Sequence, residues 1–156
     1  YLLGERAPRW NVNAKGAFIG LKMESKRSDV FRSVLEGITL NLNIILEVLR
    51  NYIEVDEILV IGGGAKGQVW RQIMADVYNV RIVVPRLLEE ATSMGAAVTG
   101  GVGVGLFKDF SAIDSFLEIQ EENLPDPDNA LKYKNVKEMF DLCYFSLLNV
   151  FDKMSE

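Results

Sequence analysis

Glu57-Ile58-Leu59-Val60-Ile61-Gly62-Gly63-Gly64-Ala65-Lys66-Gly67 is the segment from which the fold can be predicted. The four residues after Glu57 are apolar and mostly β-branched, which predicts a strand. Because both sides of this strand are apolar, we expect it to lie at the centre of a sheet. Glycines follow at once, and then a helix from about Gln68 to Tyr78, with a buried stripe formed by Trp70, Ile73, Met74 and Val77.

The rest of the chain continues this alternation of strands and helices. Apolar periodicity predicts further elements over about 28–51 (helix), 81–85 (strand), 91–105 (a helix of small residues) and 129–153 (helix). The order helix, strand, helix, strand, helix, helix predicts an α/β layered domain. We expect a short strand at 16–21, irregular structure over 1–15 and a solvated loop at 120–123.

Composition limits the classes of function. With 156 residues, 49% of them apolar, the chain is long enough for one domain with one core. The net charge of -5 argues against a broad basic face for nucleic acid. No apolar stretch is long enough to span a membrane, and no signal peptide is visible. Because Tyr1 is not an initiator Met, we expect the chain to start in the middle of a longer protein.

Two residue counts narrow the chemistry. The single cysteine, Cys143, cannot form an internal disulfide, and this fits a reducing, cytoplasmic environment. It lies in an apolar run, where we expect a small core residue. Histidine is absent, which excludes a histidine-based catalytic triad and a zinc site with imidazole ligands.

The glycine-rich loop suits a phosphate or a nucleotide. Glycine lets the backbone approach a ligand closely, and the following helix start offers free N–H groups and a positive dipole end. It is not a P-loop, because no Gly-Lys-Ser or Gly-Lys-Thr follows. Gly62, Gly64 and Gly67 fit the bare dinucleotide pattern, but no acidic residue ends the next strand. A simple strand-to-helix turn that binds nothing stays an alternative.

Several side chains allow two interpretations. Lys66 is either a phosphate contact or a solvated surface lysine. Trp70 is expected in the core, and Trp10 in the core or at an interface. Asp76 and Glu36 lie on predicted helices with apolar stripes, so we interpret both carboxylates as structural rather than catalytic.

Three ordered segments together resemble the FGGY family of carbohydrate kinases. The first joins Gly16–Leu21 to Asp29–Glu36 and matches the family's C-terminal signature. The second joins Ile61–Lys66 to Trp70–Asp76 and is similar to its adenosine-site segment. The third is Glu90–Ala97, similar to the helix downstream of that loop. The resemblance covers nearly the whole chain.

The resemblance implies an actin-like ATPase fold built from two ribonuclease-H-like domains, of which this chain would be the C-terminal, nucleotide-binding one over residues 1–156. It implies ATP or ADP as cofactor, with Mg²⁺ held mainly through the nucleotide and no metal ligands from this chain. Carried over, the residues against the nucleotide would be Gly63, Gly64 and Ala65, flanked by Lys66, Gly67 and Gln68. Gly67 stands where many members have serine, so a side-chain hydrogen bond from that position is not expected.

The remaining parts of such an enzyme would lie outside this chain. The family uses a catalytic aspartate and sugar-binding residues from an N-terminal domain, and no segment here matches them. That domain and the sugar are therefore the expected partners, with self-association of the chain as a further possibility. Gly4-Glu5-Arg6-Ala7-Pro8 resembles a segment found in members that act on xylulose and in some that act on gluconate, and the glycines of Gly100–Gly105 favour xylulose.

Overall fold

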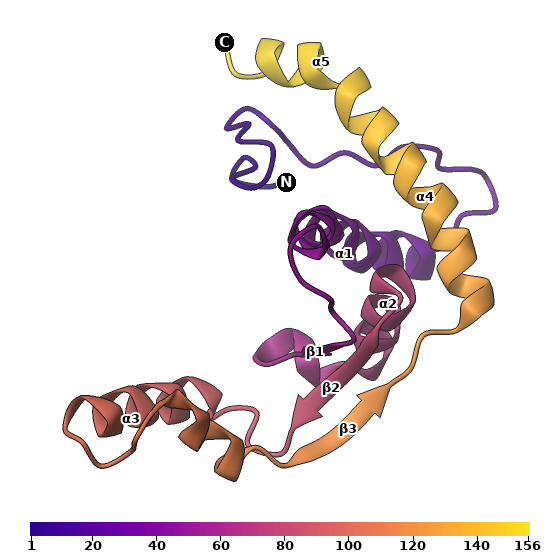
Figure 1. Cartoon of the computed structure of the whole chain (residues 1–156). Helices are drawn as coiled ribbons and strands as arrows, with labels where there is room; N and C mark the ends of the chain where they lie inside the picture. The colour runs from indigo at the N-terminus through magenta and orange to yellow at the C-terminus, as the bar shows by residue number, and fades with distance from the viewer. The chain divides into compact units, whose positions relative to one another are not determined.

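The computed structural model describes all 156 residues, 1–156. The chain divides into two compact units, which we call the sheet unit (Val55–Asp126) and the helical unit (Tyr1–Glu54 with Pro127–Glu156). Figure 1 shows the elements, which are α1 (Arg27–Arg50), β1 (Glu57–Leu59), η1 (Gly63–Lys66), α2 (Gln68–Tyr78), β2 (Arg81–Pro85), α3 (Ala91–Gly103), η2 (Phe110–Phe116), β3 (Ile119–Asn123), α4 (Pro127–Ser146) and α5 (Leu148–Lys153).

The sheet unit contains a three-stranded sheet in the order β1-β2-β3. β1 and β2 are parallel, with Ile58 opposite Ile82, as expected for two strands joined through a helix. The amide of Val60 also donates to the carbonyl of Val83 at 2.9 Å. The pairing therefore extends to Val60, two residues before Gly62. The two parallel strands therefore end at the same edge of the sheet.

Two predictions for the sheet are wrong. The segment 120–123, expected to be a solvated loop, belongs to β3 and pairs antiparallel with β2. Polar side chains of β3 pair with cationic side chains across the sheet, as Glu122 does with Arg81. The position of β3 therefore does not depend on the burial of apolar side chains. In consequence β2, not β1, is the central strand, and Leu59 of β1 is 42% exposed.

The core of the sheet unit lies between α2 and β2. Ile73 of α2 and Ile82 and Val83 of β2 are at most 1% exposed. α2 begins and ends at the residues that the sequence predicts. Its end is explained by Asn79, which adopts the left-handed conformation that commonly stops a helix. Trp70, expected in the core, is only half-buried. Gly101 of α3 is covered by the ring of Phe107, which follows the helix. A Cβ added at Gly101 would lie 2.4 Å from this ring.

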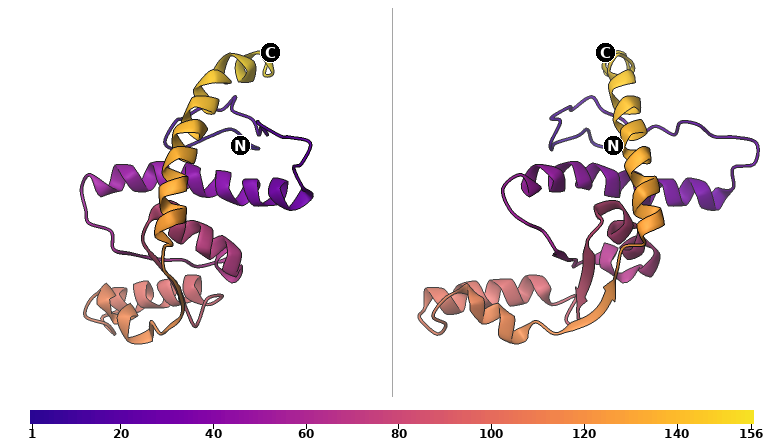
Figure 2. Two further views of the ribbon diagram at one scale, coloured as in Figure 1. Left: turned by 90° about the vertical axis from the view of Figure 1, so that its right-hand side faces the viewer. Right: turned by 45° about the vertical axis from the view of Figure 1, so that its right-hand side comes forward.

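The helical unit consists of α1, α4, α5 and the N-terminal segment. Figure 2 shows α4 crossing α1, and the Lys137 ammonium of α4 pairs with the Glu47 carboxylate of α1. Ala14, Tyr144 and Phe151 form an apolar cluster, with Tyr1 packed against it. The guanidinium of Arg9 lies 3.9 Å from the centre of the Tyr144 ring and pairs with Asp141. These contacts tie the irregular N-terminal segment to α4.

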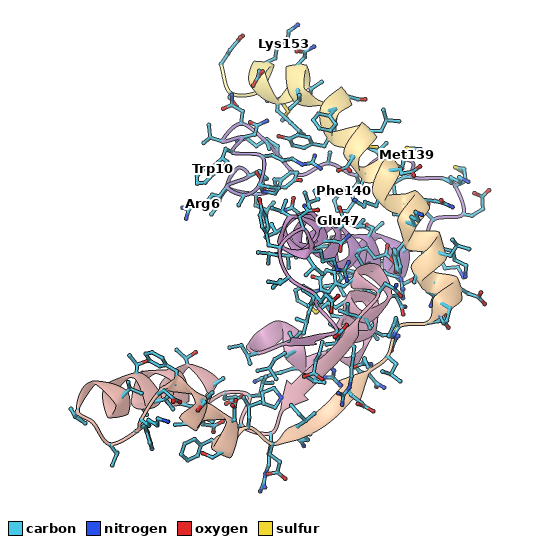
Figure 3. The ribbon with its side chains drawn as sticks, viewed as in Figure 1. Arg6, Trp10, Glu47, Met139, Phe140 and Lys153 are labelled. Atoms are coloured by element: carbon cyan, nitrogen blue, oxygen red, sulfur yellow. The ribbon has the colours of Figure 1, made fainter.

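The helical unit also departs from expectation in places. The predicted helix 129–153 is interrupted at Leu147, so α4 and α5 are separate. The segment 16–21 forms no strand. Cys143 is a free thiol of intermediate burial rather than a core residue. Trp10 is 78% exposed, which rules out the core alternative, and Figure 3 shows it on the N-terminal segment. No helix of the chain is long and apolar enough to cross a membrane.

Candidate functional site

The glycine loop lies at the carboxyl ends of the two parallel strands of the sheet unit. It follows β1 directly, and the segment that follows β2 reaches the same edge of the sheet. Between them is a pocket of about 200 Å³, lined by Ile61, Gly62, Gly63, Lys66, Leu88, Glu89 and Thr92. Ligands of open α/β sheets bind at this edge of the strands, so the position of the pocket is the one expected of a ligand site.

Backbone geometry explains the first glycine. Gly62 has φ 80° and ψ -169°, a combination that is essentially restricted to glycine. The chain then forms the short helix η1, in which the amide of Ala65 donates to the carbonyl of Gly62 at 3.1 Å. Gly62 therefore lets the chain leave β1 and turn along the pocket.

Packing favours the third glycine. A Cβ at Gly64 would lie 3.2 Å from Cζ3 of the Trp70 ring, which is closer than ordinary van der Waals contact. The half-buried indole of Trp70 thus supports the loop from the side of α2. No side chain larger than a hydrogen atom fits there without a shift of the ring or the loop.

One ion pair provides the charge at the pocket. The Lys66 ammonium donates to the Glu89 carboxylate, and this hydrogen bond holds the pKa of Glu89 below its usual value. Both side chains are largely exposed, so the pair is screened by water and salt and can exchange partners. An anionic ligand in the pocket would therefore meet a lysine that is accessible but already shared with a carboxylate.

The six residues expected against a nucleotide lie in different surroundings. Gly63 and Lys66 line the pocket. Gly64 is covered by Trp70, and Ala65 is fully buried, so its side chain does not face solvent. Gly67 and Gln68 are exposed at the start of α2, where the first-turn amides have no intrahelical acceptors and Gly67 supplies no capping side chain. The loop thus brings together two of the six at the pocket itself.

The far wall of the pocket was missed by sequence reasoning. Leu88, Glu89 and Thr92 come from the segment between β2 and the first turn of α3. Thr92 belongs to Glu90–Ala97, one of the segments that resemble the family. That resemblance is the sequence feature from which Thr92 could have been identified as a site residue. Glu89 precedes it and has no signal of its own, because only the parallel pairing of β1 and β2 places it opposite Lys66.

The two candidate carboxylates each have internal hydrogen-bond donors. Asp76 is 2% exposed, and its Oδ1 accepts from Gln72 Nε2 and from the backbone amide of Asp126, both at 2.9 Å. In the helical unit, Glu36 Oε1 accepts from Arg32 Nε at 2.8 Å and from the Tyr133 hydroxyl at 2.7 Å. These contacts are consistent with structural roles. No group of three or more acidic or cysteine side chains that could hold a metal ion occurs in the chain.

A protein-family model matches most of the chain. Residues 1–104 match the C-terminal domain of the FGGY family of carbohydrate kinases. Among curated relatives, the chain is 37% identical to a xylulose kinase of Staphylococcus epidermidis over 92% of its own length and 29% of that protein. It is 34% identical to a gluconokinase of Bacillus subtilis, over 90% of this chain and 28% of that protein. The chain thus spans less than a third of the length of these relatives.

Solved structures resemble the chain over almost its whole length. A ligand-bound xylulose kinase from Lactobacillus acidophilus matches 99% of this chain and 31% of its own with a TM-score of 0.89 and 30% identity. A glycerol kinase from Plasmodium falciparum, solved with ADP, matches 90% of this chain and 28% of its own with a TM-score of 0.72 and 27% identity.

Proposed function

Because this chain belongs to the FGGY family of carbohydrate kinases, we propose that it is the nucleotide-binding part of an enzyme that transfers the γ-phosphoryl group of ATP to a sugar hydroxyl. Its α/β architecture is the actin-like ATPase, ribonuclease-H-like fold of the solved FGGY kinases. The observation that carries the proposal is the glycine loop at the carboxyl ends of two parallel strands, where it lines a pocket together with a lysine.

The loop fits the phosphate-bearing end of a nucleotide. Gly62 and Gly63 put backbone at the wall of the pocket, and Lys66 adds one cationic side chain. The pocket volume is below the roughly 300–1,000 Å³ of complete small-molecule sites, so it can enclose only part of a nucleotide. We propose that Gly63, Gly64, Ala65, Lys66, Gly67 and Gln68 form this wall, with Ala65 as a structural member, because its amide donates to Gly62 and its carbonyl accepts from Arg71. Bound ATP would supply the phosphoryl group and, through its phosphates, the ligands for Mg²⁺.

The rest of the active site belongs, in this proposal, to an N-terminal domain that would supply the catalytic aspartate and the sugar-binding residues. D-Xylulose, giving D-xylulose 5-phosphate, is the substrate we favour, because the relative at 37% identity is a xylulose kinase and Gly100–Gly105 resembles that group. Gluconate is the alternative, supported by the gluconokinase at 34% identity. We place the enzyme in the cytoplasm, and dimer formation stays an open possibility.

Two measurements on the 156-residue chain test the proposal. With ATP, Mg²⁺ and xylulose we expect no turnover, because no catalytic aspartate is assigned here. Titration with ADP-Mg should give weak binding, with a Kd on the order of millimolar, seen as NMR shifts of the Gly63, Gly64 and Lys66 amides. Clear turnover would contradict the division of roles. Absence of shifts at saturating ADP-Mg would favour the rival in which the loop is a structural turn of a non-catalytic module.

A further inference from the structure

Arg71 is a buried cation directly behind the glycine loop. It lies in the first half of α2, and only 3% of it is exposed. Removing a guanidinium from water costs several kcal/mol per ion unless good partners replace the water. A well-packed apolar residue at such a position is often equally stable or more stable, so stability alone is a weak reason for an arginine here.

The guanidinium binds three acceptors that come from two different parts of the sheet unit. Nη1 donates to the backbone carbonyl of Ala65 at 2.6 Å, and Nε donates to Oδ1 of Asn123 at 3.1 Å. Nη2 pairs with the carboxylate of Glu121. The planar fork of arginine can hold acceptors in three fixed directions at once, which a lysine cannot do. Arg71 therefore connects the loop to strand β3.

The acceptors on β3 are themselves held in place. The side-chain amide of Asn123 donates from Nδ2 to Oε1 of Gln72 at 3.0 Å, and Gln72 Nε2 donates to the carbonyl of Leu124 at 2.8 Å. β3 in turn pairs with the buried central strand β2. Thus the carbonyl of Ala65 is fixed, through Arg71, to a strand that pairs with the buried central strand of the sheet.

The loop needs such an external restraint. Gly62, Gly63 and Gly64 have no side chains to hold them, and glycine has the largest conformational entropy to lose. Ala65 is fully buried, and a buried carbonyl that loses its donor carries a large desolvation penalty. Two pocket residues are close to Ala65 in the chain: Lys66 follows it directly, and Gly63 is two residues before it. Holding this one carbonyl therefore holds both pocket residues.

We propose that Arg71 is a positioning residue for nucleotide binding, which fixes the Ala65 carbonyl to β3 and so keeps Gly63 and Lys66 in their binding arrangement. The inference rests on the proposed function, since it assumes that the loop binds the nucleotide. It adds a role for a side chain that touches neither the pocket nor the ligand.

Arg81 offers a matched control. It is also an arginine of the sheet unit that pairs with β3, through Glu122, and with Glu57 of β1, but it makes no contact with the loop and is exposed. The variants are Arg71→Met, Arg71→Lys and Arg81→Met in the 156-residue chain. Hydrogen exchange at the amides of 62–67 and of Ile82–Val84 is measured without nucleotide, and ADP-Mg is then titrated by NMR.

We expect Arg71→Met to speed exchange in the loop by about tenfold or more at the buried Ala65 amide, which donates to the Gly62 carbonyl, because the Ala65 carbonyl loses its partner. Exchange at Ile82–Val84 should rise much less, and ADP should bind about tenfold more weakly. Arg71→Lys should show a smaller change in the same direction, and it serves as the test if Arg71→Met does not fold. Arg81→Met should leave both the loop exchange and the ADP affinity within twofold of wild type.

Three results would overturn the inference. One is loop exchange at the wild-type rate in a folded Arg71 variant. Another is an equal acceleration at 62–67 and Ile82–Val84, which would mean general destabilisation. The third is a loosened loop with unchanged ADP affinity. If the wild-type chain itself shows no ADP-dependent shifts, the proposed function fails separately, and positioning for a nucleotide fails with it even where the exchange result stands.

Discussion

The sheet unit and the helical unit use their apolar residues differently. In the sheet unit, β2 buries its apolar residues, with Ile82 and Val83 at 0% exposure, and α2 buries most of its own, although Val69 is 60% exposed. In the helical unit, α1 buries Leu40 and Leu46, while Phe31, Ile38 and Leu42 on its surface are between 43% and 60% exposed. A tightly packed α2–β2 pair can hold a glycine loop in one conformation, and the candidate site lies beside this buried interior.

The largest expected effect comes from opening that interior. Ile82→Ala removes a fully buried side chain and should lower the free energy of unfolding by about 2–5 kcal/mol. Leu49→Ala, at a position of α1 that is 48% exposed, is the control and should cost less than about 1 kcal/mol. Urea denaturation followed by circular dichroism measures both. Equal losses would show that the two units do not differ in packing as described.

Backbone conformation in the loop gives the next effect. Gly62→Ala should destabilise the chain by about 1–3 kcal/mol, because φ 80° with ψ -169° is strained for any residue with a Cβ. Gly67→Ala is the matched control, since φ -89° and ψ 107° suit alanine and the nearest atom to a new Cβ is 3.9 Å away. It should change the free energy of unfolding by less than about 1 kcal/mol, because the lower entropy of the unfolded chain is offset by the poorer N-cap propensity of alanine. A Gly62→Ala variant as stable as Gly67→Ala would remove the argument for a glycine-specific turn.

Alkaline pH tests one buried tyrosine in each unit, because the fold raises the pKa of both. Burial raises the pKa of Tyr78 in α2 to about 12, and burial with the Glu36 hydrogen bond raises the pKa of Tyr133 in α4 to about 12. Because the folded value lies above the unfolded one, near 10, each tyrosine stabilises the fold at neutral pH and this contribution is lost as pH rises from about 10 to 12.

Tyr78→Phe isolates one of these contributions. Between pH 8 and pH 11 the wild-type chain should lose about 1.4 kcal/mol through Tyr78, the value for a pKa two units higher in the folded state. The phenylalanine variant should lose that much less over the same range, while Tyr133 titrates in both. Denaturation midpoints at the two pH values measure the difference, and identical pH dependence in variant and wild type would refute it.

The smallest expected effect on stability is at the pocket. The Lys66–Glu89 pair is exposed, so Lys66→Gln should change the free energy of unfolding by less than about 1 kcal/mol. It should nevertheless weaken ADP binding several-fold and leave adenosine binding unchanged, because only ADP carries phosphates. Glu89→Gln, which removes the competing carboxylate, should strengthen ADP binding. NMR titration with both ligands checks this, and an equal loss for adenosine would place Lys66 away from the phosphates.

The candidate site could be predicted from the sequence only on one side. The glycine loop and the helix after it are local features, since each depends on residues within a few positions of one another. Gly63 and Lys66 were therefore identified as candidates before the fold was known. Glu89 and Arg71 were not, because the role of each depends on a partner more than five residues away, Lys66 for Glu89 and Ala65, Glu121 and Asn123 for Arg71.

From the sequence alone, we could predict α2 and β2 to the residue, the glycine loop between β1 and α2, and the FGGY family of the chain. Apolar periodicity, turn residues and the segments that resemble the family are all local features of the sequence. They can be recognised without knowing which distant residues are in contact. The folded structure was needed to show that the polar segment 119–123 is a strand, that β2 is the central strand and that Arg71 holds the loop. These features depend on backbone pairing between strands and on side-chain hydrogen bonds to residues outside the local pattern.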